Sequence, residues 1–175
     1  MITLQPGDYF AVRTNSWRAR LIILKERICA MDDEAKYNHA GIIVDCRGNT
    51  YESLGRIDHY HIDNYIGCPI LIARHKSMTP DAFRAGMKEV LKYDGKVYPV
   101  WRLILHLTGL AKFFKMTFPV CSELVGEHAY HAGVHTYDGW GWNPDHLADL
   151  WEISKYYDVI YEGIWKGVND DGKDS

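Results

Sequence analysis

Three residue types that can together transfer an acyl group occur far apart in the sequence, as His39, Glu52 and Cys121. Cys121 follows Pro119 closely and opens a stretch that the sequence predicts to be helical. A thiol at a helix N-terminus lies at the positive end of the helix dipole, which favours the thiolate. The backbone N–H groups of Cys121 and Ser122 would lack intrahelical acceptors, so they could hold a developing oxyanion. This pattern predicts that Cys121 is a nucleophile.

A nucleophilic cysteine needs a base within hydrogen-bond reach, and that base needs an orienting group. His39 opens a short, apolar, β-branched run that predicts a buried strand, and residues 50–54 predict the returning strand. If the residue numbers of directly paired residues in the two strands add up to an odd number, His39 and Glu52 face the same side of the sheet. A tight turn at residues 47–48 would, however, place Glu52 nearer Ile43 than His39. The sequence therefore predicts a Cys-His-Glu site but leaves the contact between histidine and glutamate open.

The remaining elements follow from hydrophobic periodicity and capping signals. Further strands are predicted at residues 9–13, 69–74 and 157–162, with an irregular strand inside 56–65. Helices are predicted at residues 17–29, 80–93 and 144–150, the second capped by Thr79 and the third by Asn143. An apolar, basic stretch with helical spacing covers residues 98–115. The order of elements indicates an α+β fold in which antiparallel strands cluster in the middle of the chain.

Bulk composition limits the class of protein. The chain has 175 residues, which fits one domain at 1–169 with a frayed polar tail at 170–175. A net charge of −3 argues against nucleic acid as the main partner. The sequence has no apolar run long enough for an integral membrane segment, and its start lacks the pattern of a secretory signal. We therefore expect a cytoplasmic protein with reduced thiols.

Several short motifs resemble one family when they are taken in order. The motifs are HAGI at 39–42, YE at 51–52 and CSELV at 121–125. Together they resemble the circularly permuted NlpC/P60 papain-like group, in which the histidine strand precedes the cysteine helix. The YiiX/YaeF-type branch is the most similar, and lecithin:retinol acyltransferase is a more distant relative.

Three weaker motifs extend this resemblance to about residues 6–150. They are PGD at 6–8, GKVY at 95–98 and NPDHLA at 143–148. The sequence departs from the family pattern where Pro99 follows Tyr98, because an acidic residue is expected there. This departure weakens any assignment of Tyr98 to the oxyanion hole.

The resemblance implies a permuted papain-like fold with a central antiparallel sheet packed against the nucleophile helix. It implies a thiol hydrolase that cleaves an amide, peptide or isopeptide bond, with Cys121 as nucleophile, His39 as base and Glu52 as orienting group. Cys121 and Ser122 would form the oxyanion hole, and we assign Tyr98 and Trp101 to substrate binding. No cofactor and no metal are expected, and the substrate would be a small molecule, a peptide or an acyl compound.

Other interpretations of the same residues remain open. The segment 100–118 could be an amphipathic lid, in which case peripheral membrane contact and lipid ester hydrolysis or acyl transfer are the alternatives. The protein could instead be an inactive module that binds a small ligand or a partner protein in the groove where the catalytic site is expected. In that case Cys121 would be a small buried hydrophobic residue. Five histidines also suggest a metal site, although no cysteine or carboxylate spacing completes it: His59, His61, His128, His131 and His135.

Overall fold

The computed structural model describes residues 2–14, 36–97, 119–139 and 142–168. Within them one antiparallel sheet has the strand order β4-β3-β2-β1-β5-β6. The strands are β1 (Tyr9–Val12), β2 (His39–Ile43), β3 (Asn49–Ser53), β4 (Ile57–His61), β5 (Pro69–His75) and β6 (Tyr157–Ile164). The helices are α2 (Pro80–Val90), α4 (Cys121–His131) and α5 (Pro144–Ile153), with short 3₁₀ turns η1 (Ile62–Tyr65) and η2 (Leu91–Tyr93).

The predicted α+β class and the antiparallel strands are confirmed. The expected helix at 17–29 lies outside the described residues. So does the stretch at 98–115, with the proposed substrate-binding residues Tyr98 and Trp101. None of the helices among the described residues is long and apolar enough to cross a lipid bilayer.

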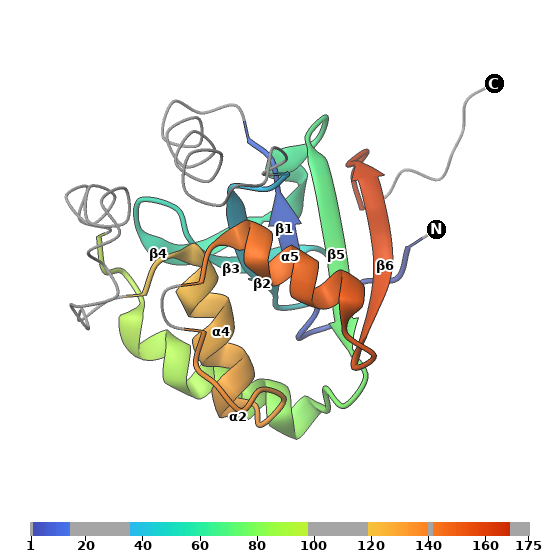
Figure 1. The fold of residues 1–175 in the computed structure, drawn as a ribbon. Coiled ribbons are helices and arrows are strands. Elements are labelled where there is room, and N and C mark those ends of the chain that lie inside the picture. Colours follow the sequence, from blue (N-terminus) through green and yellow to red (C-terminus); the bar gives the residue numbers. More distant parts are fainter. Residues whose placement is uncertain (1, 15–35, 98–118, 140–141, 169–175) are drawn as a thin grey trace.

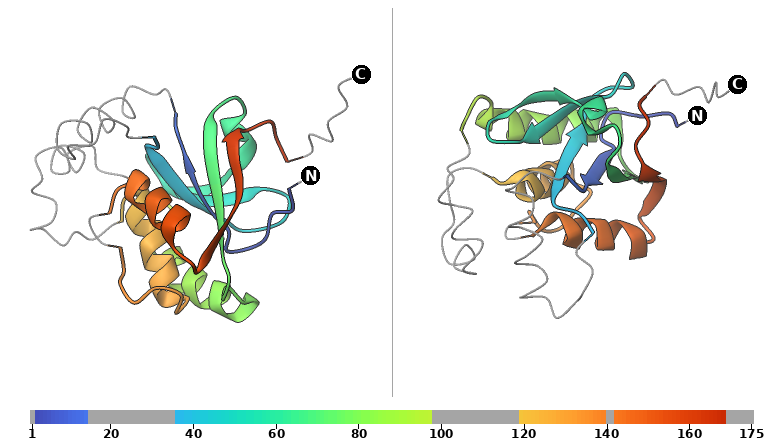
Figure 2. Two further views of the ribbon diagram at one scale, coloured as in Figure 1. Left: turned by 45° about the vertical axis from the view of Figure 1, so that its right-hand side comes forward. Right: turned by 90° about the horizontal axis from the view of Figure 1, so that it is seen from above.

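The three α-helices lie on one face of the sheet (Figures 1 and 2). The core between them contains residues from alternate strand positions and from each helix: Tyr9, Ala11, Ile42, Tyr51, Ala73, Met87, Leu124, Val125 and Trp151. A second apolar cluster covers the opposite face of the sheet: Leu4, Phe10, Val12, Ile43, Ile62, Tyr65, Ile70, Ile72 and Trp165. Because both faces are covered, the central strands are buried at successive residues and have no polar face.

Both predicted N-caps are present. The hydroxyl of Thr79 accepts a hydrogen bond from the N–H of Ala82 at 3.1 Å, and the side-chain oxygen of Asn143 accepts one from His146 at 2.6 Å. In each helix proline occupies the first position, where its missing N–H costs nothing. These local signals were sufficient to place the starts of α2 and α5.

The opening turn before β1 is held by a buried acid. Gly7 adopts a positive φ of 90°. The carboxylate of Asp8, which is 1% exposed, accepts hydrogen bonds from the guanidinium of Arg74 at 2.7 and 2.8 Å and from the N–H of Gln5 at 2.7 Å. The PGD motif therefore has a structural role in anchoring β1 to β5.

The turn between β2 and β3 differs from the tight turn considered at residues 47–48. The N–H of Val44 donates to the carbonyl of Asn49 at 2.8 Å, so the loop consists of residues 45–48. The carboxylate of Asp45 accepts hydrogen bonds from the N–H groups of Arg47 and Asn49 at 2.9 and 3.1 Å. The longer loop places Glu52 opposite Gly41 rather than Ile43, in a register that puts His39 and Glu52 on the same face of the sheet.

Candidate active site

Cys121 is the first residue of α4, as the sequence predicted, and its side chain is partly exposed. The carboxylate of Glu123 accepts a hydrogen bond from the N–H of Val120 at 2.9 Å, which stabilises the start of the helix. Ser122 is buried, and its hydroxyl donates to the carbonyl of Trp142 at 2.6 Å. These two hydrogen bonds fix the N-terminus of α4 and, with it, the position of the Cys121 thiol.

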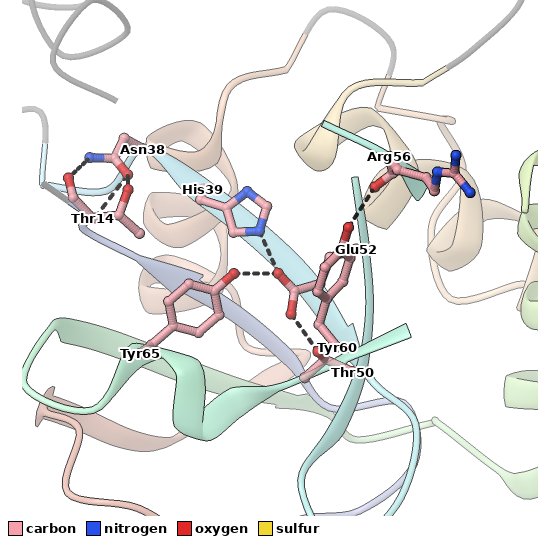
Figure 3. A network of polar contacts seen from close by, with 8 residues as sticks. All are labelled: Thr14, Asn38, His39, Thr50, Glu52, Arg56, Tyr60 and Tyr65. Atoms are coloured by element: carbon pink, nitrogen blue, oxygen red, sulfur yellow. Dashed lines mark hydrogen bonds and ion pairs between the residues drawn. The ribbon is translucent and has the colours of Figure 1, made fainter. Parts of the chain in front are cut away.

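His39 and Glu52 form a buried pair on the neighbouring strands β2 and β3 (Figure 3). The ring nitrogen Nε2 of His39 lies 2.6 Å from Oε2 of Glu52. The side chains are 6% and 0% exposed. The contact that the sequence left open is therefore made, because Glu52 lies opposite Gly41, two residues along the same face of β2 from His39.

The Glu52 carboxylate receives two further hydrogen bonds (Figure 3). The hydroxyl of Thr50 donates to Oε1, and the phenol of Tyr65 donates to the same Oε2 that contacts His39. A buried carboxylate is stable only when its oxygens are hydrogen-bonded. The two hydroxyl groups therefore help to keep Glu52 in the protein interior beside His39.

Gly41 makes room for this carboxylate. A Cβ atom at Gly41 would lie 2.8 Å from Cγ of Glu52 and 2.6 Å from Cε1 of Phe10. Both distances are shorter than any tolerable contact between carbon atoms. The glycine of the HAGI motif is therefore required by packing at the site, independent of backbone conformation.

Glu52 hydrogen-bonds to the His39 side chain, and both Glu52 and Cys121 affect the pKa of its imidazole. Burial alone would lower the pKa of His39. The interactions with Cys121 and Glu52 outweigh burial and raise the pKa of His39 to about 10. Since Glu52 occupies Nε2, the nitrogen left for the thiol is Nδ1. The geometry therefore favours the imidazolium form of His39 at neutral pH.

The start of α4 also supplies donors for an oxyanion. The N–H groups of Cys121 and Ser122 belong to the first turn, which has no intrahelical acceptors. They flank the thiol that would attack a carbonyl carbon. The arrangement of thiol, imidazole, carboxylate and first-turn amides is one that can carry out nucleophilic acyl transfer.

Sequence reasoning missed three contributors to this site: Gly41, Thr50 and Tyr65. Thr50 was within reach, because two-residue periodicity places it on the same face of β3 as Glu52. Tyr65 belongs to η1, after a change of chain direction, and no local pattern connects it to Glu52. Only the tertiary structure reveals its contact.

The five histidines considered for a metal site are not brought together. Among the described residues no group of three or more histidines, cysteines or acids is placed to hold a metal ion. His128 is buried in the core with its Nδ1 2.8 Å from the hydroxyl of Tyr9, whereas His59 and His61 lie on β4 at the sheet edge. His135 contacts the hydroxyl of Tyr157 at 2.6 Å.

Comparison with known proteins gives a likeness of fold. No family model matches the chain, and no curated protein matches its sequence significantly. Among solved structures, the chain is similar to the metalloprotein YiiX from Escherichia coli O157:H7, a protein of the DUF1105 group. The TM-score is 0.60 at 15% sequence identity, and the match covers 92% of this chain and 98% of YiiX. The chain therefore has a YiiX-like fold.

Proposed function

We propose that this protein is a thiol hydrolase of the permuted papain-like type, acting on an amide, peptide or isopeptide bond. The observation that carries the proposal is the buried hydrogen bond between His39 and Glu52, next to a partly exposed Cys121 that, with Glu52, raises the pKa of the imidazole. These residues come from β2, β3 and α4, and α4 lies far from the two strands in sequence. An ion pair with a purely structural role needs no accessible thiol beside it, whereas a nucleophilic thiol must be accessible to its substrate.

In the proposed reaction the Cys121 sulfur attacks the substrate carbonyl carbon, and the thiol proton resides on Nδ1 of His39. The N–H groups of Cys121 and Ser122 stabilise the tetrahedral oxyanion, each donor contributing about 3 kcal/mol. The imidazolium then gives its proton to the leaving amine, and the carbon–nitrogen bond breaks. His39 next takes a proton from water, whose oxygen attacks the thioester carbon. The carbon–sulfur bond then breaks, Cys121 leaves as the thiolate, and the free acid is released.

The proposal is tested by trapping and by substitution at Cys121. A panel of acyl and peptidyl electrophiles, read out by mass spectrometry, should modify Cys121 in preference to the other cysteines. The Cys121→Ala variant should lose turnover of any substrate found while its melting temperature stays within about 2 °C of wild type, since the side chain is partly exposed. Cys68→Ala, at another partly exposed cysteine, is the matched control and should retain activity.

Two results would refute the hydrolase. One is unchanged turnover in the Cys121→Ala variant. The other is alkylation of Cys121 by iodoacetamide no faster than that of exposed Cys46, which would indicate a neutral, unactivated thiol. The second result would favour an inactive binding module that uses the same site to hold a ligand.

A further inference from the structure

Tyr65 contributes to the site although it contacts no reacting atom. It ends η1 and is 5% exposed, on the sheet face opposite the α-helices. Its ring lies 5.6 Å from that of Phe10 and 5.9 Å from that of His39, measured between centroids. Packing on these two rings fixes the direction of its hydroxyl, which points at Glu52 (Figure 3).

Tyr65 can act toward Glu52 only as a donor. Burial, followed by the charge of Glu52, raises the pKa of the phenol far above its usual range, so the hydroxyl keeps its proton. Oε2 of Glu52 thus receives two donors at once, the phenol of Tyr65 and Nε2 of His39. The two donors share the negative charge of a single oxygen atom, so a change at one alters the bond to the other.

The direction in which the Tyr65 hydroxyl shifts the proton affinity of His39 can be predicted. A phenol that draws charge from Oε2 leaves less for the imidazolium, which lowers the proton affinity of His39. Removal of the phenol leaves a more basic oxygen and a more stable imidazolium, which would be a poorer proton donor to a leaving group. It also removes one of the contacts that hold the carboxylate beside the imidazole.

We propose that Tyr65 is a positioning residue that sets the orientation and basicity of Glu52 and, through it, the proton affinity of His39. The catalytic part of this proposal rests on the thiol hydrolase function. The part that concerns the proton affinity of His39 does not, because it can be measured in the resting protein.

The test is an NMR titration of the imidazole signals in the full chain, with the His39 signal assigned by its loss in a His39→Gln variant. Tyr65→Phe should raise the pKa of His39 above that of wild type. Replacement of tyrosine by 3-fluorotyrosine, a stronger donor, should lower it. Tyr60→Phe is the matched control, since the hydroxyl of Tyr60 donates to the carbonyl of Arg56 at 3.2 Å and not to Glu52 (Figure 3).

The catalytic part of the proposal is tested by the kinetics of peptidyl p-nitroanilide hydrolysis, because an aniline leaving group, unlike p-nitrophenolate, needs a proton from the imidazolium. Tyr65→Phe should lower kcat about 10-fold with KM unchanged, the effect expected when a hydrogen bond to a charged group is lost. The decline of the hydrolysis rate at alkaline pH should move to higher pH in Tyr65→Phe. Tyr60→Phe should change neither kcat nor the pH of this decline. If Tyr65→Phe fails to fold, as judged by circular dichroism, the fluorotyrosine protein decides the outcome.

The outcomes are distinct. Opposite shifts of the His39 pKa in the phenylalanine and fluorotyrosine proteins support the positioning role, even if no substrate is ever turned over. An unchanged His39 pKa in a folded Tyr65→Phe protein, or shifts of the same sign in both proteins, overturns it. Absence of any turnover in the wild-type protein would count against the hydrolase alone.

Discussion

At the scale of single residues, the buried carboxylate of Glu52 depends on hydrogen bonds from other side chains. Its side chain is completely buried, and its two oxygens contact His39, Thr50 and Tyr65. An ion in such a place is stable only with good partners. The site therefore depends on a charged residue that would destabilise the protein if its partners were removed.

Substitution of Glu52 by glutamine tests the orienting role. An amide can present its NH₂ to Nε2 and so favour the wrong tautomer, with the ring hydrogen on Nδ1 where the thiol proton should go. We expect kcat to fall about 10²–10⁴-fold, the range associated with general acid–base catalysis. Asp58→Asn, directly opposite on β4 but only half-buried, is the control and should be active. Full activity of Glu52→Gln would exclude the orienting role.

The elevated proton affinity of His39 predicts a pH dependence. The pKa of His39 in the folded protein is raised to about 10, from the ordinary value of 6.5. The stabilising effect of the imidazolium is therefore complete below pH 6.5 and is lost as the pH rises through about 10. Both the free energy of unfolding and the hydrolysis rate should decline there. Alkylation of Cys121 should not decline in this range, because it requires no proton from His39.

Measurement of the three quantities on one sample between pH 7 and 11 separates the effects. Hydrolysis and alkylation are followed by initial rates, and stability by urea unfolding. The Glu52→Gln variant should lose most of the stability change between pH 6.5 and 10. A hydrolysis rate that stays constant through pH 11 would contradict a protonated His39 as the acid.

At the scale of elements, the site is assembled by the approach of β1, β2 and β3 around Gly41. Gly41 pairs with Phe10 on one side and with Glu52 on the other. Its missing side chain lets the ring of Phe10 and the carboxylate meet over β2. The spacing of three strands thus determines the position of one catalytic group.

We expect Gly41→Ala to destabilise the fold by about 1–3 kcal/mol, since the added carbon overpacks a closed site. It should also slow turnover, because Glu52 must move away from His39. The double variant Gly41→Ala with Phe10→Leu removes the closest contact and should recover part of the stability but little of the activity. Urea midpoints and kcat would show this separation; equal recovery of both would refute the link to Glu52.

At the scale of the whole molecule, the helical layer depends on a buried histidine. His128 lies at the crossing of α4 and α2, where a Cβ atom at Gly86 would lie 2.7 Å from its Cδ2. The hydroxyl of Tyr9 on the sheet bonds to its Nδ1, and the Phe83 backbone of α2 faces the ring. His128 therefore connects the sheet and two helices while uncharged.

Burial lowers the pKa of His128 to about 4, although the Phe83 backbone opposes this. Its contribution to stability is complete above pH 6.5 and is lost as the pH falls through about 4. Each such group changes the free energy of unfolding by at most ~1.4 kcal/mol per pH unit. Urea unfolding between pH 7 and 4 should be less pH-dependent in His128→Gln than in wild type. His59→Gln, at an exposed position, should match the wild-type slope.

His135 is a second source of acid sensitivity and serves as an internal comparison. Burial, and then the nearby His75, lower its pKa to about 4. His135→Gln should therefore reduce the slope in the same direction as His128→Gln. If His128→Gln leaves the slope unchanged, acid unfolding begins elsewhere in the molecule.

The sequence by itself determined the local features of this protein. Helix starts at Thr79, Val120 and Asn143 depend on groups within three residues of one another, and apolar, β-branched runs marked the strands that carry His39 and Glu52. Both signals are short-range, so one sequence is enough to recognise them. The nucleophile, base and orienting residue were each selected in this way, and their roles remain proposals.

Only the tertiary structure decided how these residues meet. The four-residue loop held by Asp45 moved Glu52 opposite Gly41, and the chain after β4 turned back to place Tyr65 on the same carboxylate. The meeting of α4 with β2 brought Cys121 to His39 across 81 intervening residues. Contacts of this kind depend on the packing of distant surfaces against one another, which leaves no periodic trace in the local sequence.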